Sequence, residues 1–136
     1  MAATFPLQVV SIDGPEFEGE VQSITLRSIH GDVAILARHM DYCTAIGMGT
    51  AKIVLADGTE RMAACIGGML TMLDGKCRVL PQTWEFSEDI DLDRAESARK
   101  RAEERLANSS LDKESKVRAE AKLYRAMVRI GTASGK

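Results

Sequence analysis

The sequence predicts a β + α protein, with an N-terminal antiparallel β-sandwich followed by a C-terminal hairpin of two helices. Two changes in composition place the boundary near residue 87. All three prolines and nine of the eleven glycines lie before that point, and the stretch 87–130 contains neither residue type. Residues 1–86 carry 6 basic and 10 acidic side chains, whereas residues 87–136 carry 12 and 10. We therefore expect two domains, residues 1–86 and residues 87–136.

The first domain has the alternation and the turn signals of β-structure. Hydrophobic and polar residues alternate over short runs that are rich in β-branched and aromatic side chains. Turn-forming residues separate these runs, and the Asp-Gly pairs at 57–58 and 74–75 are expected to form type I′ hairpins, in which both central residues have positive φ. Many short strands at this spacing favour an antiparallel sandwich or a flattened barrel. The runs are 5–9, 24–26, 76–79 and 83–86.

The second domain is predicted to be an αα-hairpin. Asp91 is suited to cap the first helix, because its carboxylate can accept a hydrogen bond from a free backbone N–H of the first turn. Strong helix formers then continue over 92–106, with a narrow, mostly alanine face at 95, 98, 102 and 106. Ser110 or Asp112 can cap a second helix. The apolar residues of that helix return at i, i+4, i+7 and i+11, as Val117, Ala121, Tyr124 and Val128.

Four cations share one side of the second helix, at Arg118, Lys122, Arg125 and Arg129. Arg125 and Arg129 are like charges at i, i+4, which is unfavourable by a few tenths of a kcal/mol unless an anion lies between them. A solvated charged face is the simplest interpretation of such a stripe. The functional interpretation is a docking surface for a phosphate compound or an acidic protein segment.

Several classes of protein are excluded by what the sequence lacks. No stretch without a charged side chain is longer than 62–73, which is shorter than the roughly 18–20 residues needed to cross a bilayer. No basic start of a secretory signal precedes the first apolar residues, so we expect a cytosolic chain. Cys43, Cys65 and Cys77 are an odd number at wide spacings, which predicts small buried apolar residues and neither disulfides nor a zinc site.

The sequence also contains no recognisable enzyme site. A phosphate loop, a nucleophile elbow and a zinc-protease motif are all missing. The glycine pairs at 47–49 and 67–68 lie in the predicted β domain with no helix after them, so bulges or turns are expected there. Aromatic residues make up 4% of the chain and the pI is about 5.7, which argues against a nucleic-acid partner.

A series of short segments along the whole chain together resembles the ε subunit of bacterial F-type ATP synthase. The resemblance implies an N-terminal β-sandwich of about ten strands and a C-terminal two-helix domain, as the change in composition also predicts. The segments are the opening at 6–11, the turn and strand at 31–36, His39 followed by Thr44-Ala45-Ile46, the Ile66-Gly67-Gly68 step, and the hairpin rich in alanine and arginine.

This resemblance implies a non-catalytic subunit of the central stalk of a proton-translocating rotary motor. The sandwich would join the γ shaft to the membrane rotor ring of c subunits, and Asp32 and His39 would contact that ring. Relatives commonly have Pro-Gly before the histidine, where this chain has Ala37-Arg38. The hairpin would act on the α and β catalytic subunits and restrain ATP hydrolysis when extended. The complex would be peripheral to the cytoplasmic face of the bacterial plasma membrane, with no insertion of this chain.

Some members of that family bind ATP on the helical domain, through a segment of the form I-D-x-x-R-A and arginines of both helices. By resemblance the arginines would hold the phosphates and the Asp91 region would meet the base or ribose. ATP, with or without Mg²⁺, would then be a regulatory ligand, and no cofactor is required. The implied residues are Glu85, Ile90, Asp91, Arg94, Ala95, Arg101, Arg125 and Arg129.

Two hypotheses of other classes compete with this one. The chain could be a free-standing adaptor whose basic hairpin grips an acidic protein, or an enzyme with an unfamiliar site. Co-purification with γ and the membrane ring would support the stalk subunit. Co-purification with an unrelated acidic protein would support the adaptor.

Overall fold

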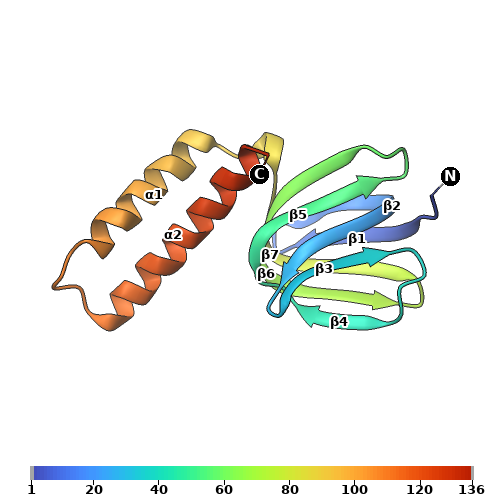
Figure 1. Ribbon diagram of the computed structural model, residues 1–136, viewed down its shortest axis with the longest axis horizontal. Helices are drawn as coiled ribbons and strands as arrows, with labels where there is room; N and C mark the ends of the chain where they lie inside the picture. The colour runs from blue at the N-terminus through green and yellow to red at the C-terminus, as the bar shows by residue number, and fades with distance from the viewer. Residues whose placement is uncertain (1, 136) are drawn as a thin grey trace.

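In the computed structural model, which describes residues 2–135, a β-sandwich is followed by two helices that project from one end of it (Figure 1). No helix in this range is long and apolar enough to cross a membrane. The strands are β1 (Phe5–Ser11), β2 (Gly14–Ser28), β3 (Gly31–Leu36), β4 (Tyr42–Ala45), β5 (Met48–Leu55), β6 (Glu60–Leu73) and β7 (Lys76–Phe86). The helical segments are the 3₁₀ turn η1 (Ser87–Asp89), α1 (Leu92–Leu106) and α2 (Lys113–Ala133).

The predicted sandwich is confirmed, although the described residues form seven strands where about ten were expected. The strand order is β1-β7-β6-β5-β2-β3, with β4 on β6, and a further pairing of β1 with β2 closes the structure. Two of the long strands, β2 and β6, change partners along their length. β6, for example, pairs with β5 up to Ile66 and with β4 from Met69 onward. Each of these two strands therefore takes the place of two shorter ones.

The Gly67-Gly68 step changes which side of β6 faces the core. Ala63 and Cys65 belong to the core before this step, whereas Leu70 and Met72 belong to it afterwards. Both glycines have positive φ, 68° and 105°, and a Cβ at Gly68 would collide with the carbonyl oxygen of Leu80. Glycine is required at this position because L side chains rarely adopt that backbone and no space exists for one.

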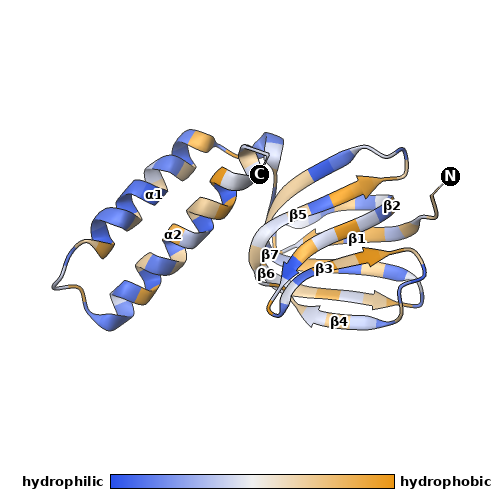
Figure 2. Cartoon of the chain, viewed as in Figure 1, coloured by the Kyte–Doolittle hydropathy of each residue, from blue (hydrophilic) through white to orange (hydrophobic). Residues whose placement is uncertain are grey.

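The hydrophobic core belongs to the sandwich alone. All the buried residues of the core cluster lie between Phe5 and Phe86, and Figure 2 shows hydrophobic positions along the strands beside a mostly hydrophilic α1. Cys65 and Cys77 are buried as predicted, and burial raises the pKa of both thiols to about 12. The same prediction was wrong for Cys43, which is exposed, because β4 directs Thr44 inward and alternation turns Cys43 outward.

The Asp-Gly pairs at 57–58 and 74–75 form different turns. Asp74 and Gly75 both have positive φ, 50° and 78°, so the predicted type I′ geometry is confirmed there. At the other pair only Gly58 has positive φ, and the prediction was wrong. The chain has a longer loop here, in which Leu55 N–H donates to the Thr59 carbonyl. Asp57 Oδ1 accepts a hydrogen bond from Thr59 N at 2.8 Å, an Asx turn that needs no positive φ at Asp57.

Both helices of the hairpin start at predicted N-cap residues. Asp91 Oδ1 accepts a hydrogen bond from Arg94 N at 3.1 Å and caps α1. Of the two candidates for the second cap, Asp112 is the one used, since its Oδ1 accepts from Ser115 N at 2.8 Å. Hydrogen bonds from the side chain and the backbone of Ser115 lower the pKa of the Asp112 carboxyl. Local cap chemistry therefore fixes where both helices start.

The predicted apolar face of α2 was wrong. Val117 is 58% exposed and Tyr124 is 46% exposed, whereas Ala119 and Ala126 are buried. On α1 the predicted alanine face is used, with Ala95 and Ala102 buried. Small side chains on both helices let the two backbones approach closely, and bulky side chains cannot occupy such an interface. The helices therefore pack through their alanines, and Val117 and Tyr124 of the more hydrophobic stripe stay exposed.

The C-terminal end of α2 lies on the outer face of β5, β6 and β7. Thr50, Ala64 and Glu85 are direct neighbours across these strands, and we call them the docking row. Thr132 Oγ1 lies 2.7 Å from Thr50 Oγ1, and Arg129 Nε donates to Glu85 Oε1 at 2.9 Å. Ala64 is buried without belonging to the core cluster. The docking row thus fixes where the hairpin meets the sandwich.

We predict that the chain ending at Phe86 folds on its own, because the core cluster contains no helical residue. Its melting temperature should lie within roughly 10 °C of the full chain, since only the cover over the docking row is lost. Thermal unfolding followed by the near-ultraviolet signal of Trp84 measures this. A gradual, non-cooperative transition in the truncated chain would contradict the independence of the sandwich.

Candidate functional site

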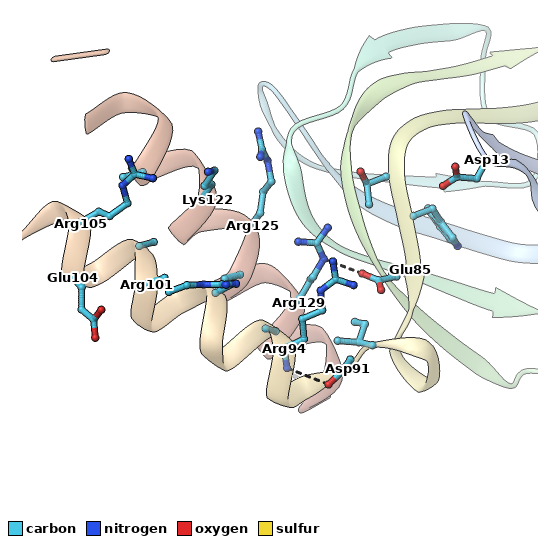
Figure 3. Close-up of a pocket in the computed structure, with 18 residues that line it drawn as sticks. Asp13, Glu85, Asp91, Arg94, Arg101, Glu104, Arg105, Lys122, Arg125 and Arg129 are labelled. Carbon is cyan, nitrogen blue, oxygen red and sulfur yellow. Dashed lines mark hydrogen bonds and ion pairs between the residues drawn. The ribbon is translucent and has the colours of Figure 1, made fainter. Parts of the chain in front are cut away.

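A cleft of about 1080 Å³ lies where the two helices meet the end of the sandwich (Figure 3). Its walls come from four places: Asp13 in the β1–β2 turn, residues 83–85 of β7, the hinge residues Ile90 and Asp91, and the inner sides of α1 and α2. The volume is at the upper end of the range of ligand pockets, roughly 300–1,000 Å³. The cleft is thus large enough for a nucleotide-sized molecule.

The structure brings together all the residues that the family resemblance implies for ATP binding. They come from β7, the hinge and both helices, so only the tertiary fold makes them neighbours. On α1, Ala95 belongs to the buried alanine face, and Arg94 and Arg101 line the cleft from the same helix. The residues that line the cleft in this way are Glu85, Ile90, Asp91, Arg94, Ala95, Arg101, Arg125 and Arg129.

Positive charge dominates the cleft. Among the described residues, only Arg129 of its six basic side chains has a carboxylate within 4 Å, that of Glu85. Arg94 is joined to Asp91 only through its backbone N–H. Unpaired guanidinium groups that converge in one cleft are a site for an anion, because each can donate charge-assisted hydrogen bonds. The basic residues are Arg94, Arg101, Arg105, Lys122, Arg125 and Arg129, and the acidic ones are Asp13, Glu85, Asp91 and Glu104.

The predicted stripe of four cations on α2 divides into two groups. Lys122, Arg125 and Arg129 line the cleft. Arg118 does not line it, and instead donates to Glu114 at 2.9 Å with its side chain 72% exposed. Arg118 is therefore a solvated surface residue, as the simplest interpretation of the stripe expected.

Sequence reasoning missed several residues of the cleft. Arg105 is one, although it follows Arg101 at i+4 and Arg94 at i+11, and helical spacing alone could have found it. Asp13 and Trp84 also line the cleft. No local signal identifies these two, because they reach the cleft only through the pairing of β1, β2 and β7.

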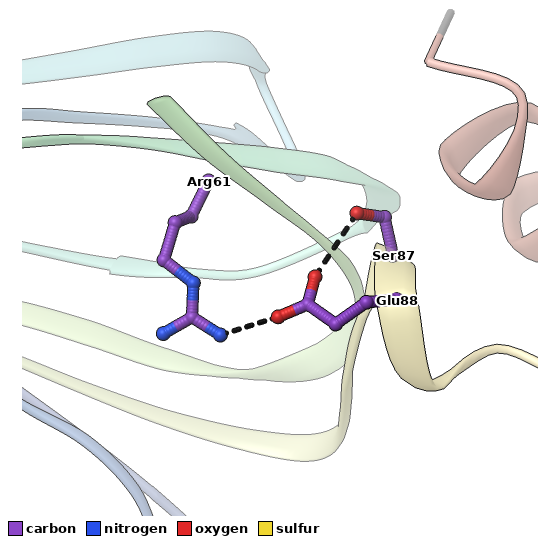
Figure 4. Close-up of polar contacts among 3 residues, drawn as sticks. All are labelled: Arg61, Ser87 and Glu88. Atoms are coloured by element: carbon purple, nitrogen blue, oxygen red, sulfur yellow. Dashed lines mark hydrogen bonds and ion pairs between the residues drawn. The ribbon is translucent and has the colours of Figure 1, made fainter. Parts of the chain in front are cut away.

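Arg61 fixes the start of the hinge (Figure 4). Its guanidinium carbon lies 3.7 Å from the centre of the Phe86 ring, and its Nη2 donates to Glu88 Oε1 at 2.6 Å. Ser87 Oγ donates to the other carboxylate oxygen at 3.3 Å. The hydrogen bond from Arg61 is the main reason that the pKa of the Glu88 carboxyl is lowered. These contacts hold η1 and so position Ile90 and Asp91 at the cleft.

Two family models match the chain, one for each part. Residues 4–87 match the β-sandwich domain of the ATP synthase delta/epsilon chain, and residues 88–134 match its long α-helix domain. The chain belongs to the ATP synthase delta/epsilon family. The predicted resemblance to the ε subunit of the bacterial enzyme is confirmed.

Relatives named ATP synthase epsilon chain match this chain over most of their length. The ATP synthase epsilon chain of Caldicellulosiruptor bescii is 38% identical over 128 residues, covering 94% of this chain and 92% of that one. The chain from Desulfitobacterium hafniense is 36% identical, with 98% of each chain covered. The relative from Acetobacterium woodii, described as sodium ion specific, is 34% identical over 82% of this chain and 84% of its own.

Solved structures agree on the fold. A chain of the Euglena gracilis mitochondrial ATP synthase superimposes with a TM-score of 0.82 at 20% identity, covering 93% of this chain and 79% of that chain. A chain from the central stalk and c-ring of the Tetrahymena thermophila mitochondrial enzyme gives 0.63 at 14% identity, covering 99% and 98%. At these identities the likeness concerns the fold alone.

Two residues that the family resemblance implies for the rotor ring lie apart in this delta/epsilon chain. Asp32 is exposed near the start of β3, and His39 follows the end of that strand. His39 Nδ1 lies 2.7 Å from the Met40 carbonyl, and its ring packs near Tyr42. Arg38 has φ 66°, the backbone that the glycine of a Pro-Gly would favour. The turn before the histidine therefore keeps a glycine-like conformation without glycine.

No group of three or more His, Cys, Asp or Glu side chains in residues 2–135 has a metal-binding arrangement. Within residues 2–135, the carboxylates of the cleft make two contacts, the cap at Asp91 and the pair at Glu85.

We predict that the contribution of Arg61 to the free energy of unfolding depends on pH. The lowered pKa of Glu88 means that its stabilising effect is present above its unfolded pKa of roughly 4 and is lost as pH falls through the folded value. Arg61→Gln should lower the stability at pH 7 by a few tenths of a kcal/mol, as for other exposed ion pairs. The difference from wild type should shrink below roughly pH 4.

Thermal unfolding across this pH range measures the effect. Lys76→Gln is the matched control, because Lys76 is an exposed cation of the same domain without an ion pair among the described residues. A deficit in Arg61→Gln that stays constant down to pH 3 would show that Glu88 plays no part, and only the contact with Phe86 would remain.

Proposed function

We propose that this chain is a non-catalytic central-stalk subunit of a rotary ATP synthase, and that its helical hairpin binds ATP in the basic cleft. The observation that carries this proposal is the convergence of both helices, the hinge and β7 on one cleft with five unpaired cations among the described residues. The family membership supplies the complex to which the subunit belongs.

The chemistry of the cleft suits a nucleoside triphosphate. Arg94, Arg101, Arg125 and Arg129 can surround the phosphates, because planar guanidinium groups match phosphate oxygens in pairs. Ile90 and Ala95 offer apolar contact for a base. The Asp91 cap uses Oδ1, so Oδ2 is available to accept a hydrogen bond from a ribose hydroxyl.

ATP bound in this cleft would stabilise the docked hairpin. The cleft exists only while α1 and α2 lie together against β7, so a ligand that bridges them binds the docked state and not an extended one. Such a ligand contributes RT ln(1 + [ATP]/Kd), about 2.7 kcal/mol at a hundredfold excess over Kd. The alanine faces bury little area, so the docked and extended states should differ by only a few kcal/mol. ATP would then act as a regulatory ligand that limits inhibition of hydrolysis.

The sandwich would carry the contacts with the γ shaft and the rotor ring of c subunits. Asp32 and His39 lie toward opposite ends of β3, which is the last strand of its sheet. A ring contact that includes both residues would therefore run along the β3 edge. The hairpin, with its basic cleft and Arg118, would face the α and β subunits. Such a subunit would be peripheral to the cytoplasmic face of a bacterial plasma membrane.

We predict that Arg125→Ala weakens ATP binding by about one to two powers of ten. Each charge-assisted hydrogen bond lost is worth roughly 1.5–3 kcal/mol, and 1.4 kcal/mol corresponds to a factor of ten. Isothermal titration calorimetry on the isolated chain measures the affinity.

Arg118→Ala is the control, because Arg118 lies on the same helix outside the cleft and its substitution should leave the affinity within about twofold. No heat of binding for wild type at millimolar ATP would contradict the proposed site. Equal losses in the two variants would show that only the overall charge of α2 matters.

We also predict that the purified chain does not hydrolyse ATP. The sequence has no phosphate loop or activated nucleophile to carry out the reaction. A phosphate-release assay on protein at increasing purity measures this. Steady release that follows the chain through every purification step would contradict a purely regulatory role for ATP.

A further inference from the structure

A buried hydrogen-bond donor on the sandwich side of the cleft has no partner within residues 2–135. It is the indole Nε1 of Trp84, a residue that is 5% exposed and lines the cleft from β7. A buried indole N–H usually has an acceptor, because an unpaired one gives up the hydrogen bonds that water would offer it. The other buried nitrogen without a partner, Arg99 Nε, does not line the cleft and lies 3.7 Å from Glu103 Oε1. The indole N–H therefore marks a place in the cleft where a ligand can supply an acceptor.

The indole ring of Trp84 is held in one position by its neighbours. Trp84 belongs to the core cluster and lies across from Cys65 on β6. Its ring meets the ring of Phe86 edge to face, with the ring centres 5.6 Å apart and the planes at 86°. A side chain packed in a dense core does not turn to find another partner. The position of the N–H is therefore set before a ligand binds.

An unpaired acceptor, the carboxylate of Asp13, lines the same cleft from the turn between β1 and β2. Figure 3 shows Asp13 on the sandwich side, away from the labelled arginines of α1 and α2. The backbone N–H of Asp13 donates to Ser11 Oγ at 3.1 Å, which fixes the turn. Among the described residues the carboxylate itself has no hydrogen bond or ion pair. The sandwich thus presents one free donor and one free acceptor to the cleft.

The two sides of the cleft differ in charge. All six basic side chains that line it belong to α1 and α2. The described residues that line it from the sandwich include no cation, and they are Asp13, Thr83, Trp84 and Glu85. Phosphate groups are attracted to the basic side and repelled by carboxylates. A nucleotide in the cleft is therefore oriented with its phosphates toward the helices and its uncharged end toward the sandwich.

We propose that Trp84 and Asp13 together bind the edge of an adenine base. Trp84 Nε1 donates to a ring nitrogen of the base, and the Asp13 carboxylate accepts from its 6-amino group. Adenine suits this pair because its amino group is flanked by the acceptor nitrogens N1 and N7. This inference rests on the proposed ATP site and adds two residues of the sandwich to it. The nucleotide then contacts both domains, with its base at the sandwich and its phosphates at the hairpin.

The indole N–H can be observed directly, because Trp84 is the single tryptophan of the chain. A nitrogen-15 labelled full chain gives one indole N–H resonance. Saturating ATP should shift this proton downfield, as formation of a hydrogen bond does. Inorganic tripolyphosphate is the matched control ligand, because it carries the phosphates without the base. It should bind at the arginines and leave the indole resonance in place.

Calorimetry on the same sample separates this inference from the proposed function. Heat of ATP binding with an unmoved indole resonance would overturn the role of Trp84 and leave the ATP site intact. A shift of equal size with tripolyphosphate would also overturn it, since phosphates would then lie at the indole. No heat of ATP binding at all would overturn the proposed site, and this inference with it.

Trp84→Phe removes the N–H and keeps an aromatic ring against Phe86. We expect it to weaken ATP binding by roughly tenfold, because the hydrogen bond to the ligand replaces no other partner of this N–H. The affinity for tripolyphosphate should stay within about twofold, which also shows that the variant is folded and keeps the basic wall. Equal affinity of wild type and Trp84→Phe for ATP would contradict the proposed hydrogen bond.

The 6-amino group is tested with purine riboside triphosphate, which lacks it. Wild type should bind ATP roughly tenfold more tightly than this analogue, and Asp13→Ala should bind the two about equally. Glu104→Ala is the matched control, because it removes one negative charge from the helical side of the cleft, and it should keep the wild-type ratio. An Asp13→Ala chain that keeps the wild-type preference for ATP would overturn the role of Asp13.

Discussion

The contact of α2 with the outer face of β5, β6 and β7 is the constraint on which the remaining features depend. It requires a small residue at Ala64 and polar partners on either side, at Thr50 and Glu85. Because α2 is fixed there, Arg129 lies at β7 and α1 follows through its alanine interface. Without that contact the basic faces of both helices would point into solvent, and no cleft would exist between the hairpin and the sandwich.

The hairpin combines weak packing with concentrated charge. Alanine faces allow the helices to approach but bury little apolar area, while six basic side chains converge on one cleft. Their mutual repulsion opposes the docked state, and an anion between them relieves it. A position held by few contacts can be shifted by a ligand or by a competing partner, which is the property that a regulatory element requires.

Local signals in the sequence predicted local structure well. The caps at Asp91 and Asp112, the helix over 92–106 and the turn at 74–75 depend on neighbouring residues only, and all agree with the structure. The family resemblance also implied eight residues that do line one cleft. The sequence could not predict the packing face of α2, because hydrophobicity favoured Val117 and Tyr124 over the alanines that the close helix contact requires. The docking row likewise depends on strand register, which no local pattern specifies.

ATP that acts on the chain in the cleft between the hairpin and the sandwich should slow the exchange of backbone amides around that cleft. Amide hydrogen exchange of the isolated protein, measured with and without millimolar ATP, tests it most directly. We expect slower exchange in the hinge and first turns of α1, in the last turns of α2, and in residues 83–85 of β7, with the β3–β4 end of the sandwich unchanged. Slowed exchange confined to that opposite end, or no change anywhere, would contradict it.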